Sequence, residues 1–278
     1  MTIAERTQKN APATGSVTAK LTRPGLPAGE FNATFFDVYK LNHELHIWAQ
    51  QGDEESFEAI FLRIPCNTPD GEHPILPGDP GSERIRVHFI DQKAGTANGG
   101  PADNGKLSGF KWGNDKHSVT FNFEFSGIYR IEDKYTITGG GLTLEFGELS
   151  DLKDIKAGTG TVSATVDPAV FPNYELFKAS NISFVPEGEG SGFHQLLAWQ
   201  TIEGPEPSVQ GVMLRISNTT PENYIGFFKR GQELLLANHD GLKGVEWNKE
   251  KRTFKANFEF TFLDGTHKVE AGEVNLSY

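Results

Sequence analysis

The sequence contains a single cysteine, Cys66, among 278 residues. One cysteine excludes an intrachain disulfide and a metal site built from several thiolates. No apolar run approaches the roughly 20 residues that a membrane-spanning helix needs. The start of the chain is polar and lacks the apolar segment of a signal peptide. We therefore expect a disordered tail over residues 1–16 and a cytoplasmic protein, with leaderless export left open.

Positive charge is also in short supply. The chain has 26 Lys and Arg against 37 Asp and Glu, which gives a formal net charge of −11. Nucleic acid and anionic membrane surfaces both attract proteins with a basic footprint. The sequence therefore predicts no nucleic-acid partner and no stable membrane insertion.

One stretch of the chain occurs twice. Residues 107–125 contain Leu-x-Gly-x-x-Trp and, nine residues later, Asn-Phe-Glu-Phe. Residues 242–260 repeat this pattern 135 positions further on without a gap. Shorter matches flank it and include the pairs His43 and His194, Trp48 and Trp199, and Arg63 and Arg215. Matches of this specificity predict an internal duplication.

The duplication predicts two homologous units, residues 17–146 and residues 162–278, with a linker over residues 147–161. A residue that the fold requires is expected in both copies. We therefore assign the shared tryptophans and the Asn-Phe-Glu-Phe runs to the fold, and search for functional groups among residues that occur in one copy only.

Within each unit, apolar and polar residues alternate with a period of two. Phe121, Phe123 and Phe125 alternate with polar residues, as in a strand with one buried face. About eight short strands in each unit predict an all-β protein made of two antiparallel β-sandwich or β-barrel units. Whether the intervening Glu124 and Glu259 face solvent or a polar interior stays open at this point.

The first unit carries an insertion over about residues 66–106 that the second unit lacks. It is rich in Gly and Pro, so it predicts a shaped loop rather than an additional strand. Long loops on a rigid β scaffold are common places for binding sites.

Two groups of residues are candidates for ligand binding. In the segment Arg84–Ile90, strand alternation places Arg84, Arg86 and His88 on one side. Such a cationic row can receive a carboxylate or a phosphate, and the alternative is an exposed face paired with nearby acids. His46 and Trp48 share a face of another strand, where they offer a polar and aromatic contact surface.

The insertion adds Asp70 and His73 as further candidate ligand-binding residues. The acidic residues around them do not have the spacing of a calcium-binding loop. The sequence therefore predicts no metal and no cofactor.

Three classes of function fit these features. The preferred one is a non-catalytic binding protein that recognises a small ligand, a glycan or a protein through its loops, with oligomerisation left open. The first alternative is a cofactor-independent isomerase or cyclase, or a carrier, with an apolar substrate inside a β-barrel cavity. The second is a membrane-acting β-protein toxin.

Overall fold

The structure, a computed structural model, describes most of the chain as β-strands. The described residues are 13–41, 43–53, 56–76, 84–93, 96–113, 116–129, 133–146, 158–185, 193–204, 208–231, 233–263 and 265–278. The protein is all-β, with curled antiparallel sheets, and no α-helix occurs among the described residues. None of these residues therefore belongs to a helix long and apolar enough to cross a membrane.

The first half of the chain forms one curled antiparallel sheet of ten strands. Its strands are β1 (Thr14–Thr22), β2 (Gly29–Asn32), β3 (Phe35–Leu41), β4 (Glu44–Gly52), β5 (Ser56–Pro65), β6 (Gly71–Ile75), β7 (Arg86–Lys93), β8 (Thr96–Trp112), β9 (Ser118–Ile128) and β10 (Lys134–Glu145). The strand order is β2-β1-β10-β9-β8-β7-β5-β4-β3, with β6 beside β8. The 17-residue strand β8 pairs with β7 through its first part and with β9 through its second. The sheet therefore folds back over itself at β8.

The second half forms two antiparallel sheets of five strands each. One has the order β12-β11-β20-β19-β18, and the other has the order β13-β14-β15-β16-β17. Their strands are β11 (Thr159–Asp167), β12 (Leu176–Lys178), β13 (Asn181–Val185), β14 (Phe193–Ile202), β15 (Ser208–Ser217), β16 (Tyr224–Arg230), β17 (Glu233–Leu236), β18 (Lys243–Asn248), β19 (Thr253–Phe262) and β20 (His267–Ser277).

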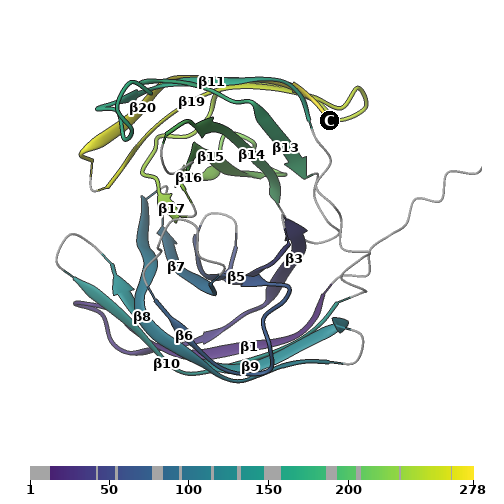
Figure 1. The fold of residues 1–278 in the computed structure, drawn as a ribbon, viewed down its shortest axis with the longest axis vertical. Coiled ribbons are helices and arrows are strands. Elements are labelled where there is room, and N and C mark those ends of the chain that lie inside the picture. The colour runs from purple at the N-terminus through teal and green to yellow at the C-terminus, as the bar shows by residue number, and fades with distance from the viewer. Residues whose placement is uncertain are drawn as a thin grey trace, which may run out of the picture.

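These sheets stack in four layers (Figure 1). The outer layers contain β1 and β8–β10 at one side and β11, β19 and β20 at the other. The two inner layers face each other: β3, β4, β5 and β7 from the first half, and β13–β17 from the second. We call these the first and second inner sheets.

Each half has its own apolar core between its outer and inner layers. The phenylalanines of β9 and β19 point into these cores, as their alternation predicts. Glu124 and Glu259 point to solvent, where they pair with Lys106 at 3.1 Å and with Lys243 at 3.8 Å. The question left open by the sequence is therefore answered in favour of a solvated face.

A third apolar cluster joins the two inner sheets. It contains Trp48, Phe57, Ala59, Phe61 and Ile90 of the first half and Phe193, Leu197, Met213, Ile225, Phe227 and Leu234 of the second. We call it the inter-half cluster. Trp48 is fully buried in it and Trp199 packs against it, whereas Trp112 and Trp247 pack against the cores of the separate halves.

Within residues 66–106, the strand predicted over Arg84–Ile90 corresponds to β7, whereas the prediction of a loop is wrong for β6 and for the start of β8. The glycines there permit close strand packing instead. Gly99 has φ 102°, and a Cβ at this position would lie 2.2 Å from the carbonyl oxygen of Phe89 on β7. Residues 77–83 and 94–95 of the insertion lie outside the described residues.

The predicted ends of the tail and the linker also differ from the strand limits. β1 begins at Thr14, within the segment 1–16, and β11 begins at Thr159, within the segment 147–161. Residues 1–12 and 147–157 lie outside the described part of the chain. The aligned pair His43 and His194 is not equivalent in environment, because His43 is exposed at a turn with φ 66° and His194 is buried within β14.

Candidate functional site

A row of polar side chains crosses the first inner sheet. Tyr39 of β3, His46 of β4, Arg63 of β5 and Arg86 of β7 are successive register partners. Each is at most 5% exposed. Phe61 precedes Arg63 by two residues and belongs to the inter-half cluster, so the row faces the second half of the chain. We call these four residues the polar row.

Within the polar row, the guanidinium group of Arg63 is buried without an ion pair among the described residues. Arg63 is 2% exposed, and its Nε and Nη2 atoms have no hydrogen-bond partner among the described residues. Burial lowers the pKa of Arg63 to about 10. The charge of Glu44 acts to raise this pKa, and the charge of Arg86 acts to lower it. Arg63 is therefore a cation at neutral pH, in a place where lost hydration costs several kcal/mol.

Glu44 lies at the edge of the polar row, and its carboxylate contacts two residues of the row. Its Oε1 accepts a hydrogen bond from Arg86 Nη1 at 3.3 Å, and its Oε2 lies 3.4 Å from His46 Nε2. Burial alone would raise the pKa of Glu44, but the contact with His46 and the charges of Arg63 and Arg86 lower it to about 2. Glu44 is therefore ionised, with its side chain 18% exposed.

Lys229 approaches the row from the second half. It follows Phe227 of the inter-half cluster by two residues on β16, so both side chains leave the strand on the same face. The side-chain amine of Lys229 makes no hydrogen bond or ion pair within the described part of the chain. Burial lowers its pKa to about 7; the charges of Arg63 and Arg86 act in the same direction, and that of Glu44 acts against them. The site thus adds a partly neutral amine to the guanidinium of Arg63.

His88 connects the halves beside the row. Its Nε2 donates a hydrogen bond to the carbonyl oxygen of Leu234 at 2.8 Å, so Nδ1 is the acceptor nitrogen, and no described residue donates to it. Burial lowers the pKa of His88 to about 3, and the charge of Arg63 acts in the same direction. His88 is therefore neutral at physiological pH.

Tyr39 closes the other end of the row. Its hydroxyl donates to Gln195 Oε1 of the second half at 2.8 Å, and its oxygen lies 3.1 Å from His46 Nδ1. Burial raises the pKa of Tyr39 and lowers that of His46. Both groups are therefore uncharged, and the surplus of positive charge is confined to the Arg63 side of the site.

Arg215 shows how another arginine is paired at this interface, although its Nε and Nη2 atoms, like those of Arg63, have no hydrogen-bond partner among the described residues. It is 1% exposed, its Nη1 lies 3.1 Å from Asp37 Oδ2 of the first half, and its guanidinium group stacks 4.0 Å from the ring centroid of Trp48. A carboxylate from the opposite half and an aromatic ring together compensate its burial. Arg63 has no equivalent of Asp37 among the described residues.

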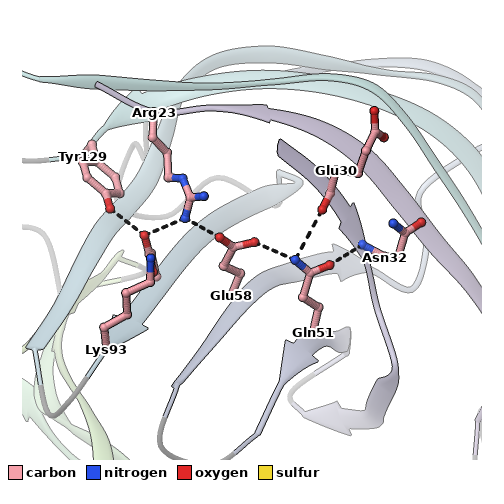
Figure 2. Close-up of polar contacts among 8 residues, drawn as sticks. Arg23, Glu30, Asn32, Gln51, Glu58, Lys93 and Tyr129 are labelled. Carbon is pink, nitrogen blue, oxygen red and sulfur yellow. Dashed lines mark hydrogen bonds and ion pairs between the residues drawn. The ribbon is translucent and has the colours of Figure 1, made fainter. Parts of the chain in front are cut away.

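A second polar network lies at the other ends of the same strands (Figure 2). Arg23 pairs with Glu58 and, at 2.8 Å, with Asp91, which also accepts from the Tyr129 hydroxyl at 2.5 Å. Gln51 extends this network through Glu58, Glu30 and the backbone of Asn32. Because the chain itself supplies donors to the carboxylates of both Glu58 and Asp91, we assign this network to the stability of the first core.

The structure brings four of the seven predicted binding residues to one buried face. Arg86, His88, His46 and Trp48 all face the second half, and none is exposed. The alternative prediction, an exposed cationic face on the strand that contains Arg86 and His88, is therefore wrong for these two residues. The single-strand pattern gave the correct side for each residue, but it could not indicate that a second sheet covers that side.

The other three predicted residues lie elsewhere. Arg84 is exposed and precedes β7. Asp70 accepts a hydrogen bond from the backbone N–H of Trp112 at 3.1 Å, and His73 contacts the ring of Phe110 and the carbonyl oxygen of Pro69. Asp70 and His73 therefore belong to the surroundings of β6 and β8 and are separate from the polar row.

Sequence reasoning missed Arg63, Glu44 and Lys229 as members of one site. Arg63 is matched by Arg215, so a search among residues that occur in one copy only does not include it. A signal was available, since Phe57, Ala59, Phe61 and Arg63 alternate along β5 and place a cation on an otherwise apolar face. No local pattern indicates that Lys229, more than 160 residues away, faces Arg63.

No known protein-family model, curated protein sequence or solved structure matches this chain. Among the described residues, no group of three or more His, Cys, Asp or Glu side chains is arranged to hold a metal ion. The chemistry of the site is therefore argued from the buried basic groups themselves.

Proposed function

We propose that this protein binds a small organic carboxylate between its two halves, with Arg63 as the main anion-binding group and Lys229 beside it. One observation carries the proposal: a guanidinium group that is 2% exposed has two donor nitrogens without a partner in the described part of the chain.

Energetics support this proposal. A buried charge that lacks a partner destabilises a fold by several kcal/mol, and an apolar residue of similar volume would avoid that penalty. A bound anion would compensate Arg63, as Glu44 compensates Arg86. The side chains of Glu44 and Glu233 are 18% and 22% exposed. The edge of the interface that these two residues mark is therefore in contact with solvent.

A carboxylate is favoured over other anions by the example of Arg215. The Asp37 carboxylate already forms an ion pair with that arginine from the opposite half, within the same interface. A ligand carboxylate at Arg63 would repeat this arrangement, with its organic part against the aromatic inter-half cluster. Planar pairing between guanidinium and carboxylate groups gives such contacts their geometric specificity.

The variant Arg63→Met tests the proposal. Titration calorimetry would compare benzoate and butyrate with their uncharged amides, benzamide and butyramide. We expect the wild-type protein to bind the carboxylates and not the amides, and Arg63→Met to lose about tenfold or more in affinity, equal to about 1.4 kcal/mol. Lys20→Met, which removes an exposed lysine from β1, is the control and keeps wild-type affinity.

Stability provides a second readout on the same variant. If Arg63 has no partner in the unliganded protein, Arg63→Met raises the free energy of unfolding by about 1–4 kcal/mol. Carboxylate binding that is unaffected by the substitution, or a clear loss of stability in Arg63→Met, would contradict the proposal.

We also infer that the two halves are copies of one ancestral unit, corresponding to residues 17–146 and residues 162–278. Besides the sequence matches, this is supported by backbone details that recur at matched positions. Gly109 and Gly244 have φ of 63° and 60°, and β1 and β11 both change register at corresponding residues. The duplication makes Arg63 and Arg215 counterparts, one of which has an acidic partner in the opposite half.

A further inference from the structure

We propose that Lys229 forms a Schiff base with a carbonyl group of the bound carboxylate, so that the ligand class is that of small oxo acids. This inference rests on the carboxylate site proposed above and assigns a covalent step to it. Arg63 would hold the carboxylate while the amine of Lys229 condenses with the carbonyl carbon of the same molecule.

The position of Lys229 supports this step. The Lys229 side chain leaves β16 toward the first half, between the apolar Phe227 on its own strand and Leu234, its register partner on β17. The charged groups that act on it come from three strands of the opposite sheet: Glu44 on β4, Arg63 on β5 and Arg86 on β7. His46 also lies within electrostatic reach of Lys229. Two cations and one anion therefore face the amine, and the anion is already shared by Arg86 and His46.

Such surroundings make an amine nucleophilic at neutral pH. Only the uncharged amine attacks a carbonyl group, and lysines become uncharged when they are desolvated beside other cations. Burial and the neighbouring Arg63 bring the pKa of Lys229 to about 7, so about half of the side chains are uncharged at that pH. Arg63 remains protonated at this pH and is available for the carboxylate.

The reaction is balanced without an oxidant or a cofactor. The Lys229 nitrogen attacks the carbonyl carbon, and a proton passes from nitrogen to oxygen to give a carbinolamine. Loss of the hydroxyl group as water then leaves a C=N bond between ligand and lysine. The ordered carboxylate on Arg63 would orient the carbonyl group for attack and would offset the positive charge of the protonated imine.

Reductive trapping tests this inference on the intact protein. Pyruvate, the probe with both functional groups, and acetone, a ketone without a carboxylate, would each be incubated with the protein and sodium cyanoborohydride at pH 7. Peptide mass spectrometry then locates the modified lysines. We expect pyruvate to leave a carboxyethyl group on Lys229 about tenfold or more faster than on the exposed Lys178, because far more of its amine is uncharged. Acetone reacts with the same uncharged amine but has no carboxylate for Arg63 to hold, so it would label Lys229 more slowly than pyruvate does.

Two variants separate the roles of the two basic groups. Lys229→Arg keeps a cation but has no nucleophilic amine, so it would form no adduct at this site. Arg63→Met would keep the amine but lose selective trapping by pyruvate. Circular dichroism and the thermal midpoint establish that each variant is folded.

The outcomes distinguish the covalent step from the site on which it rests. Benzoate binding without preferential labelling of Lys229 overturns the Schiff base and leaves the carboxylate site standing. Absence of both benzoate binding and Lys229 labelling overturns both proposals. Labelling of Lys229 by acetone as fast as by pyruvate overturns the role of Arg63 in orienting an oxo acid.

Discussion

Arg63 and Arg215 occupy matched positions in the sequence but have different surroundings. Arg215 pairs with Asp37 across the interface, whereas Arg63 has no acidic partner among the described residues. The expectation that a shared residue serves the fold left both arginines outside the search for functional groups. That expectation compares residue types, and it cannot indicate whether the partner of each residue is also shared.

His88 makes the stability of the protein sensitive to acid. An unfolded histidine with a pKa of about 6.5 binds a proton below that pH, whereas burial holds the pKa of folded His88 at about 3. The unfolded state therefore binds more protons between these two values, so the free energy of unfolding falls as the pH is lowered through this window.

The variant His88→Gln measures this contribution, because a glutamine amide can still donate to Leu234. Between pH 6 and pH 4, we expect the unfolding free energy of the variant to fall less steeply than that of the wild type, by up to about 1.4 kcal/mol per pH unit. Urea unfolding at a series of pH values provides the comparison. The same slope in both proteins would show that His88 is accessible to protons in the folded state.

At the scale of elements, a glycine in one strand faces a phenylalanine ring in the next in each half. A Cβ on Gly140 of β10 would lie 2.3 Å from the Phe123 ring, and a Cβ on Gly272 of β20 would lie 2.6 Å from the Phe258 ring. Neither glycine has the positive φ that would itself require glycine. The requirement is therefore one of space for the aromatic ring over the neighbouring strand.

We expect Gly140→Ala to lower the free energy of unfolding by about 1–3 kcal/mol, because the buried ring must move to accommodate the methyl group. Gly141→Ala is a matched control on the adjacent residue, where the nearest atom to a Cβ is 3.7 Å away. Denaturant unfolding of both variants gives the comparison. Equal losses for the two variants would argue against the contact between the glycine and the ring.

Strands with one buried face were predictable from the sequence, and the Gly- and Pro-rich insertion was harder to interpret. Alternating Phe residues predicted the cores that β9 and β19 help to form. The Gly- and Pro-rich start of β8 was predicted to be a loop, although its glycines allow close contact with β7. Composition alone does not separate glycine that permits a turn from glycine that permits close packing. Pairing partners that are distant in sequence make the difference, and one strand in isolation does not specify them.

At the scale of the whole molecule, the ion pair of Arg215 and Asp37 links the two halves. We expect Asp37→Asn to destabilise the protein by about 2–4 kcal/mol, because it leaves the fully buried guanidinium group of Arg215 without its counter-charge. Urea unfolding followed by tryptophan fluorescence is a suitable measurement, since Trp48 stacks on that guanidinium group.

A double-mutant cycle isolates the contribution of the pair. In the background Arg215→Met, the substitution Asp37→Asn is expected to have little further effect, because no buried charge remains to be compensated. Additive losses in the double variant would contradict a direct coupling between the two halves through this pair.

The long strand β8 gives the two halves different mechanical properties. In the first half, β8 belongs to both the outer and the inner layer, so these layers cannot separate without breaking backbone hydrogen bonds. In the second half, the layers are separate sheets, which among the described residues are tied by such contacts as the bridge between Asn238 and Thr261. The second inner sheet is consequently the more compliant wall of the interface. A carboxylate that binds Arg63 as proposed would therefore enter by displacing the second inner sheet, while the first inner sheet stays in place.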